Sequence, residues 1–352
     1  MQIQGIYRAK LYRLCLFLMV IGTLGMSATS LRAEGTWAKK ADMPTARTGL
    51  AAAVVDGIIY VIGGATIKFS TLATMEAYDP ETDTWEEKAD MPTARTYLST
   101  AVVDGKIYVI GGETANTVFA NGVDVYDPVT DKWTRKADMP TSRSTFATAV
   151  VDGIIYVIGG YIGGCRGTGT VEAYDPTTDT WTRKADMPTG RWWVVGAATD
   201  GEIYAIGGET ACGATTSAVE VYDPAADKWT KITNKPLQNQ NFAFGTIPVV
   251  DGRIYMPGVQ GVGSYDPATD AWATEPNLLT PRNGAAAVAV NDRIYVIGGS
   301  TAWNSPGLTA VEEFTPEGWP FPIPKSTSVS PQGKMPALWG RLKSGKRLSE
   351  RR

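Results

Sequence analysis

Arginines recur at one fixed place in this chain, and a ring of guanidinium groups could bind an anion. They follow short Pro-containing segments that read MPTAR twice, then MPTSR, MPTGR and LTPR. Guanidinium groups bind carboxylates through paired hydrogen bonds, so five around one opening would suit a sugar acid or an acidic peptide. A structural role stays open, with each arginine paired inside its own repeat. The five are Arg47, Arg95, Arg143, Arg191 and Arg282.

Residues that occur in one copy only are the other candidates for a binding face. Trp192 and Trp193 follow Arg191, while Arg166 and Trp303 lie in variable segments. Aromatic and arginine side chains on one rim are typical of protein interfaces and of sugar-binding platforms. One of the two successive tryptophans is also expected to face inward, because side chains alternate along an extended chain.

Catalytic candidates are few. Glu113 and Glu209 each follow a pair of glycines, and either could move a proton beside the arginines. The chain has no histidine, which excludes Ser-His-Asp and Cys-His catalysis and histidine metal sites. We therefore expect no metal and no cofactor, and we favour a binding role over an enzymatic one.

A 48-residue repeat must position these residues. Its tryptophans stand 48 apart, and two looser copies end at Trp272 and Trp319. A period of this length is one supersecondary unit per copy, and such units must stack to bury a core. The regularly spaced tryptophans are Trp37, Trp85, Trp133, Trp181 and Trp229.

One repeat, residues 95–133, reads as four short strands. An Asp-Gly hairpin turn joins the first two, a double glycine ends the second, and a Tyr-Asp-Pro turn separates the last two. Four antiparallel strands per repeat predict a blade of a β-propeller. Six copies of the inner hairpin, the fifth degenerate, predict an all-β, six-bladed ring. Residues 36–40 precede any inner strand, so we expect this N-terminal strand to close blade six.

The repeat resembles the kelch motif, with Gly111-Gly112, then Tyr126, then Trp133, over residues 36–319. The resemblance implies a kelch-type propeller that acts as a binding scaffold. Galactose oxidase shares the motif but needs histidine ligands that this chain lacks. N-acetylneuraminate epimerases, which are exported six-bladed kelch enzymes, supply the alternative function. A cytosolic ubiquitin-ligase adaptor is disfavoured, because the chain has no room for a BTB-type domain.

The ends of the chain read differently from the repeats. Residues 1–33 resemble a secretory signal, with a basic start, an apolar run and small residues that allow cleavage after Ala28 or Ala33. An uncleaved anchor is the alternative. We therefore expect a secreted protein, extracellular or periplasmic, with the propeller at 34–319. Residues 320–352 are a Pro/Ser-rich linker and a basic tail, either disordered or a short helix that touches a membrane or cell surface.

The net charge of the propeller limits the class of partner that it can bind. Residues 34–324 hold 21 basic and 35 acidic residues, a net charge of −14, which disfavours nucleic acid. We expect a monomer that binds an unknown protein or an anionic glycan through the face at the channel mouth.

Cys165 and Cys212 follow the double glycines of neighbouring repeats. Export permits a disulfide between them, and two free thiols are the alternative.

Overall fold

The structure is a computed structural model that describes residues 35–66, 70–115, 118–232, 245–258, 261–302 and 305–316. The predicted signal peptide, the basic tail, Trp303 and Trp319 lie outside the described residues. Within the described part of the chain, no helix combines the length and apolar character needed to cross a bilayer.

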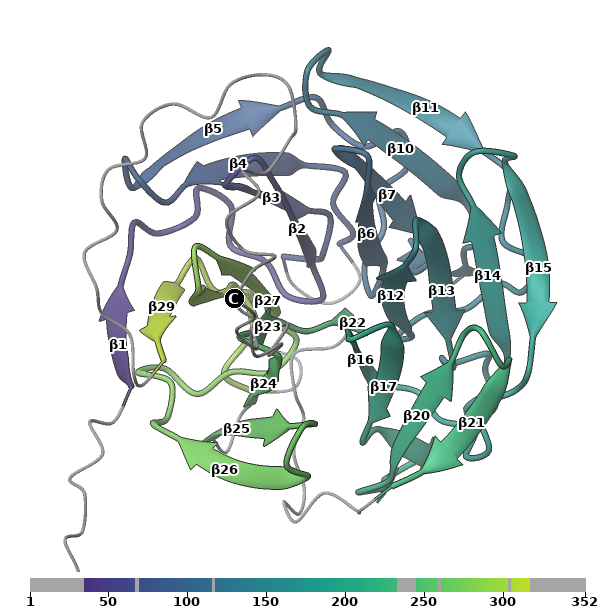
Figure 1. The fold of residues 1–352 in the computed structure, drawn as a ribbon. Coiled ribbons are helices and arrows are strands. Elements are labelled where there is room, and N and C mark those ends of the chain that lie inside the picture. Colours follow the sequence, from purple (N-terminus) through teal and green to yellow (C-terminus); the bar gives the residue numbers. More distant parts are fainter. Residues whose placement is uncertain are drawn as a thin grey trace, which may run out of the picture. The chain divides into compact units, whose positions relative to one another are not determined.

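The described residues form six antiparallel sheets arranged as the blades of a ring, which confirms the predicted six-bladed propeller (Figure 1). Blade one contains β2 (Ala51–Val55), β3 (Ile58–Ile62), β4 (Met75–Asp79) and β5 (Thr84–Lys88). Blade two contains β6 (Ser99–Val103), β7 (Lys106–Ile110), β10 (Val123–Asp127) and β11 (Lys132–Lys136). Blade three contains β12 (Ala147–Val151), β13 (Ile154–Ile158), β14 (Val171–Asp175) and β15 (Thr180–Lys184).

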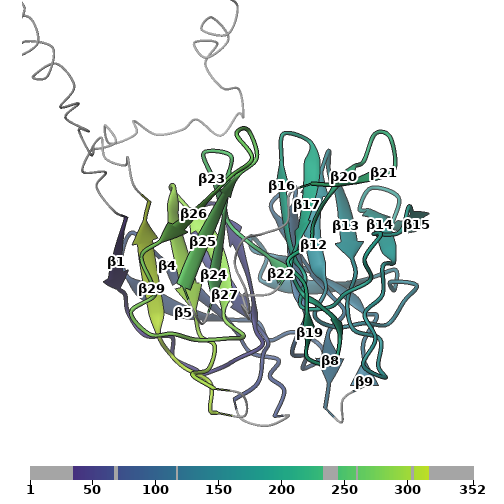
Figure 2. The same ribbon diagram turned by 90° about the horizontal axis from the view of Figure 1, so that it is seen from below.

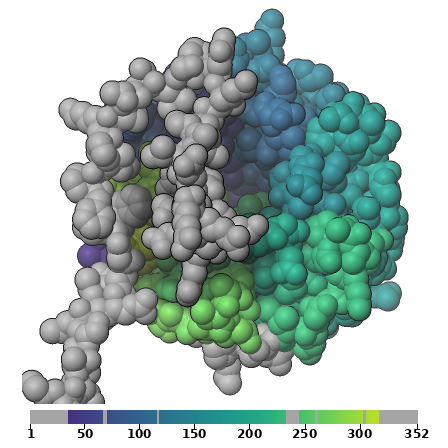
Figure 3. Space-filling model, in the orientation of Figure 1, coloured from purple at the N-terminus to yellow at the C-terminus, as the bar shows by residue number. Residues whose placement is uncertain are grey.

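The second half of the ring follows the same plan. Blade four contains β16 (Val195–Thr199), β17 (Glu202–Ile206), β20 (Val219–Asp223) and β21 (Lys228–Lys231). Blade five contains β23 (Val249–Val250), β24 (Arg253–Gly258), β25 (Gly261–Asp266) and β26 (Ala271–Glu275). Blade six contains β27 (Ala286–Val290), β28 (Arg293–Ile297), β29 (Val311–Thr315) and β1 (Thr36–Lys39). In Figure 3 the colours pass from blue through teal to green around the part of the ring that is not covered by grey atoms.

Glycines are required where the blade turns. In blade one, the hairpin residues Asp56 and Gly57 have φ values of 50° and 81°, as a two-residue turn of this kind needs. Gly63 has φ +64°, and a Cβ there would lie 2.5 Å from the carbonyl oxygen of Arg95 in the next blade. The double glycine therefore permits both a left-handed backbone and close packing of neighbouring blades.

The N-terminal strand closes the ring, as predicted. β1 pairs antiparallel with β29, and Trp37 stands opposite Phe314 in the register. Their rings lie 4.9 Å apart, and Trp37 Nε1 donates a hydrogen bond to the carbonyl oxygen of Pro276 in blade five. Blade six is thus built from both ends of the propeller sequence.

Repeated side chains hold one blade against the next. Tyr60 of blade one lies 5.8 Å from Tyr126 of blade two between ring centroids. Asp131 of blade two accepts hydrogen bonds from its own Tyr126 hydroxyl and from the backbone N–H of Ala89 in the preceding connection. Trp133 Nε1 donates to the carbonyl oxygen of Ala89. This junction thus combines apolar burial with fixed polar contacts.

Blade five departs from this pattern. The short strand β22 (Gly245–Thr246) leaves its own blade and pairs in parallel with β16 of blade four. The hydroxyl groups of Thr246 and Thr148 form a hydrogen bond of 2.7 Å in which either can be the donor. Thr246 Oγ1 also donates to the carbonyl oxygen of Thr100. Pro248 follows, and proline cannot donate to a strand ladder, so β23 has only two residues. The chain of blade five therefore crosses the axis of the ring.

Candidate functional site

The five arginines are buried, and this corrects the prediction that they form an anion-binding ring. They lie four residues before the inner strands rather than at their start, and their exposure is at most 1%. Each guanidinium pairs with a carboxylate on the third strand of its own blade. The pairs are Arg47–Glu76, Arg95–Asp124, Arg143–Glu172, Arg191–Glu220 and Arg282–Glu312.

Blade three shows how such an arginine is held. Arg143 lies 2.6 Å from Glu172 and donates to the carbonyl oxygens of Gly159 and Thr170. Thr141 donates to the other oxygen of Glu172. Burial lowers the pKa of Arg143 to about 10, against the opposing effect of Glu172, so the group stays charged at neutral pH. A guanidinium engaged in this way stabilises the blade and is not available to a ligand.

A different group of residues forms an accessible face, which we call the loop face. It consists of the segments that follow the double glycines of blades two, three and four, together with the residues just after their arginines. Blade two contributes the hairpin of β8 (Glu113–Thr114) and β9 (Val118–Phe119), and blade four that of β18 (Glu209–Ala211) and β19 (Ala214–Thr215). Figure 2 shows β8, β9 and β19 together at one end of the ring. Blade three contributes residues 161–170.

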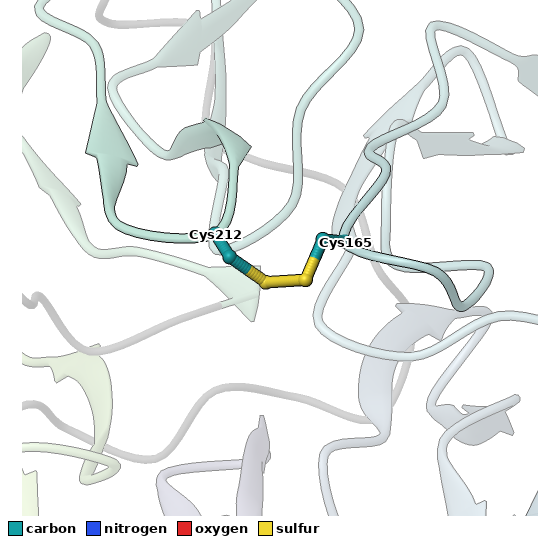
Figure 4. Close-up of a disulfide and its surroundings, with 2 residues drawn as sticks. All are labelled: Cys165 and Cys212. Carbon is teal, nitrogen blue, oxygen red and sulfur yellow. A yellow bond between two sulfur atoms is a disulfide. The ribbon is translucent and has the colours of Figure 1, made fainter.

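A disulfide joins two of these segments. Cys165 of blade three and Cys212 of blade four are bonded, with their Cα atoms 5.0 Å apart (Figure 4). Arg166 adds an antiparallel bridge to Ala211 beside the disulfide. Arg166, a predicted ligand-binding residue, therefore helps to connect the two segments through its backbone. The link restricts how far blades three and four can separate on this face.

Backbone strain marks the inner rim of the loop face. The second residue after each arginine has a left-handed backbone, and it is glycine in blades one and six. Blades two to four instead place Tyr97 (φ 53°), Thr145 (φ 51°) and Trp193 (φ 52°) there. Bulky and β-branched residues seldom adopt this conformation. Such strain is concentrated at functional sites in proteins, which makes these three positions candidates for ligand contact.

The strained residues are linked by a chain of backbone hydrogen bonds around the axis. Trp193 N–H donates to Thr145, Thr145 to Tyr97, and Tyr97 to Gly49. Because each blade contributes one link, the spacing of these side chains is fixed by the ring itself. These hydrogen bonds help to stabilise the three unfavourable backbone conformations.

Aromatic side chains gather on the loop face. Trp193 meets Tyr97 edge-on at 5.4 Å, although blade three lies between their blades. Tyr161 contacts Trp192 at 5.3 Å and Phe119 at 5.4 Å. Trp192 is buried and Trp193 half-buried, so the alternation expected of the two tryptophans is present. We call Tyr97, Phe119, Tyr161, Trp192 and Trp193 the aromatic cluster.

The two predicted glutamates lie beside this cluster. Glu113 is half-buried and accepts a hydrogen bond from Ser144 at 2.6 Å. Burial raises the pKa of Glu113, and the Ser144 hydroxyl opposes that shift. Glu209 pairs through its backbone with Trp192. The five arginines pair with other carboxylates, so they do not supply the cationic partners of Glu113 and Glu209 that the predicted sugar-acid chemistry required.

The family follows from comparison with known proteins. The KLHDC2/KLHL20/DRC7 Kelch-repeats domain matches residues 21–137 and 88–258, and the Kelch motif matches residues 281–319. The chain belongs to the kelch-repeat family. Its repeats, double glycines and propeller all agree with this membership.

Curated kelch proteins resemble only part of the chain. Kelch repeat protein C2 of Vaccinia virus (strain Western Reserve) is 39% identical over 92 residues, which cover 23% of this chain and 18% of that protein. An F-box/kelch-repeat protein of Arabidopsis thaliana is 37% identical over 67 residues, covering 18% of each chain. The chain thus spans about a fifth of each relative's length, so the likeness extends to kelch repeats and not to whole proteins.

A solved structure supports the fold. The structure of YjhT superposes with a TM-score of 0.65 at 16% identity, covering 77% of this chain and 95% of that one. At this identity the likeness shows a shared fold alone.

Proposed function

We propose that this kelch protein is an exported scaffold that binds another protein through its loop face. Kelch propellers generally bind proteins. The observation that carries the proposal is the aromatic cluster, whose ring contacts join blade two to blade four through Tyr97 and Trp193 and link blades two, three and four through Phe119, Tyr161 and Trp192. Clustered aromatic side chains are the usual anchors of protein interfaces.

Exposed apolar side chains support the same face. Val118 in β9 and Ile162 in the blade-three segment are 59% and 44% exposed, and each neighbours a member of the aromatic cluster in sequence. Exposed apolar residues beside half-buried aromatic side chains are typical of an interaction surface. The disulfide and the chain of backbone hydrogen bonds keep the loop face in one conformation, which lowers the conformational entropy lost on binding.

A sugar-acid enzyme remains the alternative from the sequence, and the geometry gives it less support. Its anion would have to bind without the five arginines, since these pair with carboxylates inside the blades. The acidic character of residues 34–324 also disfavours an anionic ligand.

Site-specific crosslinking tests the loop face. We would replace Val118 or Ile162 of the full chain with a photoreactive phenylalanine analogue and irradiate it in the organism's extracellular fraction. Both should give one discrete protein adduct, which excess unlabelled protein suppresses and excess Ile162→Asp protein does not. Val129, 92% exposed on a strand-connecting turn, is the control and should give none. Equal adducts from all three positions, or binding only to a glycan panel, would refute the proposal.

Export has its own test. N-terminal sequencing of protein recovered outside the cytoplasm should begin at Thr29 or Glu34, after cleavage at Ala28 or Ala33. Recovery of the uncleaved chain from the cytosol alone would contradict export and leave the loop-face proposal standing.

A further inference from the structure

A cavity of about 280 Å³ lies on the axis of the ring. Fourteen of its sixteen lining residues are Ala, Val, Ile or Pro, contributed mainly by the inner strands of the blades. The two polar ones, Thr100 and Thr246, hydrogen-bond to carbonyl oxygens of neighbouring strands. An apolar cavity of this kind favours an apolar occupant over water.

The two ends of the cavity are built differently. β22 crosses the axis beside the first residues of β16, at the end nearer the loop face, where its residue Thr246 is exposed. Along β2, Ala51 to Ala53 are buried and Val54 is half-buried. Val102, Val150 and Val249 hold the equivalent half-buried position in other blades. Exposure thus increases toward the Asp-Gly turns, where the cavity opens.

Acidic side chains surround this opening. An aspartate follows two residues after the half-buried lining position, so its Cα lies about 7 Å further along the strand. Among the described residues, none of these aspartates forms an ion pair. The nearby cations are engaged elsewhere, as in Lys106–Asp127 at 2.7 Å and Arg293–Glu313 at 2.9 Å. Exposed members of the ring are Asp56, Asp104, Asp152, Asp200 and Asp251, with Asp292 half-buried in blade six.

The hairpin geometry explains an Asp or Asn at these positions but does not choose between them. Both residues tolerate the left-handed backbone that the turn requires. Blade six uses Asn291 at φ 48° in this turn, so a neutral side chain is compatible with the fold. Aspartate in the other five blades therefore adds charge that the turn itself does not need.

We propose that this cavity binds a small amphiphilic cation. Its apolar part occupies the channel, and its ammonium group lies at the ring of aspartates. The volume is just below the range of about 300–1,000 Å³ typical of small-molecule pockets, which suits a short alkyl chain. The site lies at the opposite end of the inner strands from the loop face and does not depend on the function proposed above.

The test uses the full chain and three six-carbon probes in isothermal titration calorimetry. Hexylammonium should bind, 1-hexanol should bind more weakly, and hexanoate should show no binding. Raising the salt concentration from about 0.02 to about 0.5 M should weaken hexylammonium binding and leave hexanol unchanged, since salt screens exposed charges. Equal binding of hexylammonium and hexanoate, or no binding of hexylammonium, would overturn the proposal.

Two variants separate charge from cavity. Asp104→Asn/Asp152→Asn/Asp200→Asn keeps the turns and should weaken hexylammonium binding about tenfold, from three exposed charge interactions. Glu81→Gln/Glu87→Gln/Asp90→Asn removes the same charge from exposed positions of blade one and its connection and should have no effect. Equal losses in the two triple variants would mean non-specific attraction and reject the site.

Ala198→Ile tests the cavity itself. Ala198 is a half-buried lining residue whose equivalents in blades one to three are valines, so a larger side chain fits the fold. The variant should weaken hexylammonium and hexanol alike by more than tenfold. Unchanged binding of both probes in Ala198→Ile would place the ligand outside the channel and refute the proposal.

Discussion

Five blades each bury one guanidinium against one carboxylate. Taking two charges out of water is costly, and the attraction between them offsets that cost only when the remaining donors and acceptors are satisfied. In blade three, two carbonyl oxygens and the Thr141 hydroxyl meet most of this condition for Arg143 and Glu172, while Arg143 Nε has no hydrogen-bond partner among the described residues. The repeated arginine therefore belongs to the interior of the blade and ties its entry turn to its third strand.

Arg143→Met should destabilise the protein by about 3–5 kcal/mol, because it leaves the buried Glu172 without its cationic partner. Urea unfolding at neutral pH measures the loss. Arg183→Ala is the control, since Arg183 pairs with Asp186 where both are more than half exposed, and it should cost at most about 1 kcal/mol. Similar losses of stability in the two variants would show that the effect does not depend on burial of the ion pair.

Thr145→Gly should stabilise the protein by about 1 kcal/mol. It relieves a left-handed β-branched residue, and it removes a buried hydroxyl that lacks a hydrogen-bond partner among the described residues. The reverse change, Gly49→Thr, should destabilise, because a Cβ there would lie 2.4 Å from Thr96 Oγ1. Thermal unfolding of both variants checks the signs, and a destabilised Thr145→Gly protein would contradict the strain argument.

At the scale of the element, the blade is assembled from sequence that is local except in blade six. There the outer strand β1 comes from the N-terminal end of the ring and the other three strands from its C-terminal end. The ring therefore closes only when the two ends meet, and Trp37 contributes an aromatic contact and a hydrogen bond at that closure.

Trp37→Ala should therefore loosen one blade specifically. We expect a loss of about 2–3 kcal/mol, from half-buried aromatic area and one hydrogen bond. Amide exchange in β29 should quicken. Trp133→Ala removes the same contacts within blade two and is the matched control, with β29 unaffected. Unchanged exchange in β29 of the Trp37 variant would contradict closure by this strand.

The blades could be predicted because their cause is local and periodic. Asp-Gly turns, double glycines and strand lengths repeat every 48 residues, and each acts over a few positions. The arginine partners also had a visible signal, since a carboxylate follows 29 residues after Arg47, Arg95, Arg143 and Arg191. Alternation within the strand, however, does not reveal which way a guanidinium turns.

Other features depend on contacts between distant residues. The fifth copy of the inner hairpin is degenerate in sequence, but nothing local indicates that Gly245–Thr246 pairs with blade four. The left-handed backbones of Tyr97 and Trp193 were equally hidden, because these residue types rarely adopt them. Trp192 and Trp193 are candidates from the sequence, but their ring contacts with Tyr161 and Tyr97 depend on how neighbouring blades pack.

At the scale of the whole molecule, four junctions between blades contain the same polar contacts and should lose stability under the same conditions. Hydrogen bonds from a tyrosine hydroxyl and from a backbone N–H of the preceding connection lower the pKa of one aspartate at each of four junctions. The aspartates are Asp83, Asp131, Asp179 and Asp227.

The stability that these aspartates contribute should be lost in acid. Because their folded pKa is lowered, the contribution is fully present above the unfolded value of about 3.9 and disappears as the pH falls through the folded pKa. Urea unfolding at a series of pH values below about 5 should show one cooperative transition that weakens steadily. Tyr126→Phe removes the largest cause of the shift at Asp131 and should reduce the pH dependence. Stability that stays constant down to about pH 2.5 would contradict this account.

The axial strand β22 also bears on how such a protein can change its number of repeats. Near-identical 48-residue units are easily gained or lost by unequal recombination, and a ring with one more unit would have a wider bore. Gly245–Thr246 lies against the inner strands β6, β12, β16 and β27 at the present diameter. Its hydroxyl bonds to Thr100 and Thr148 would then span too great a distance. The contacts of β22 therefore favour a ring of six repeats over a ring of any other number.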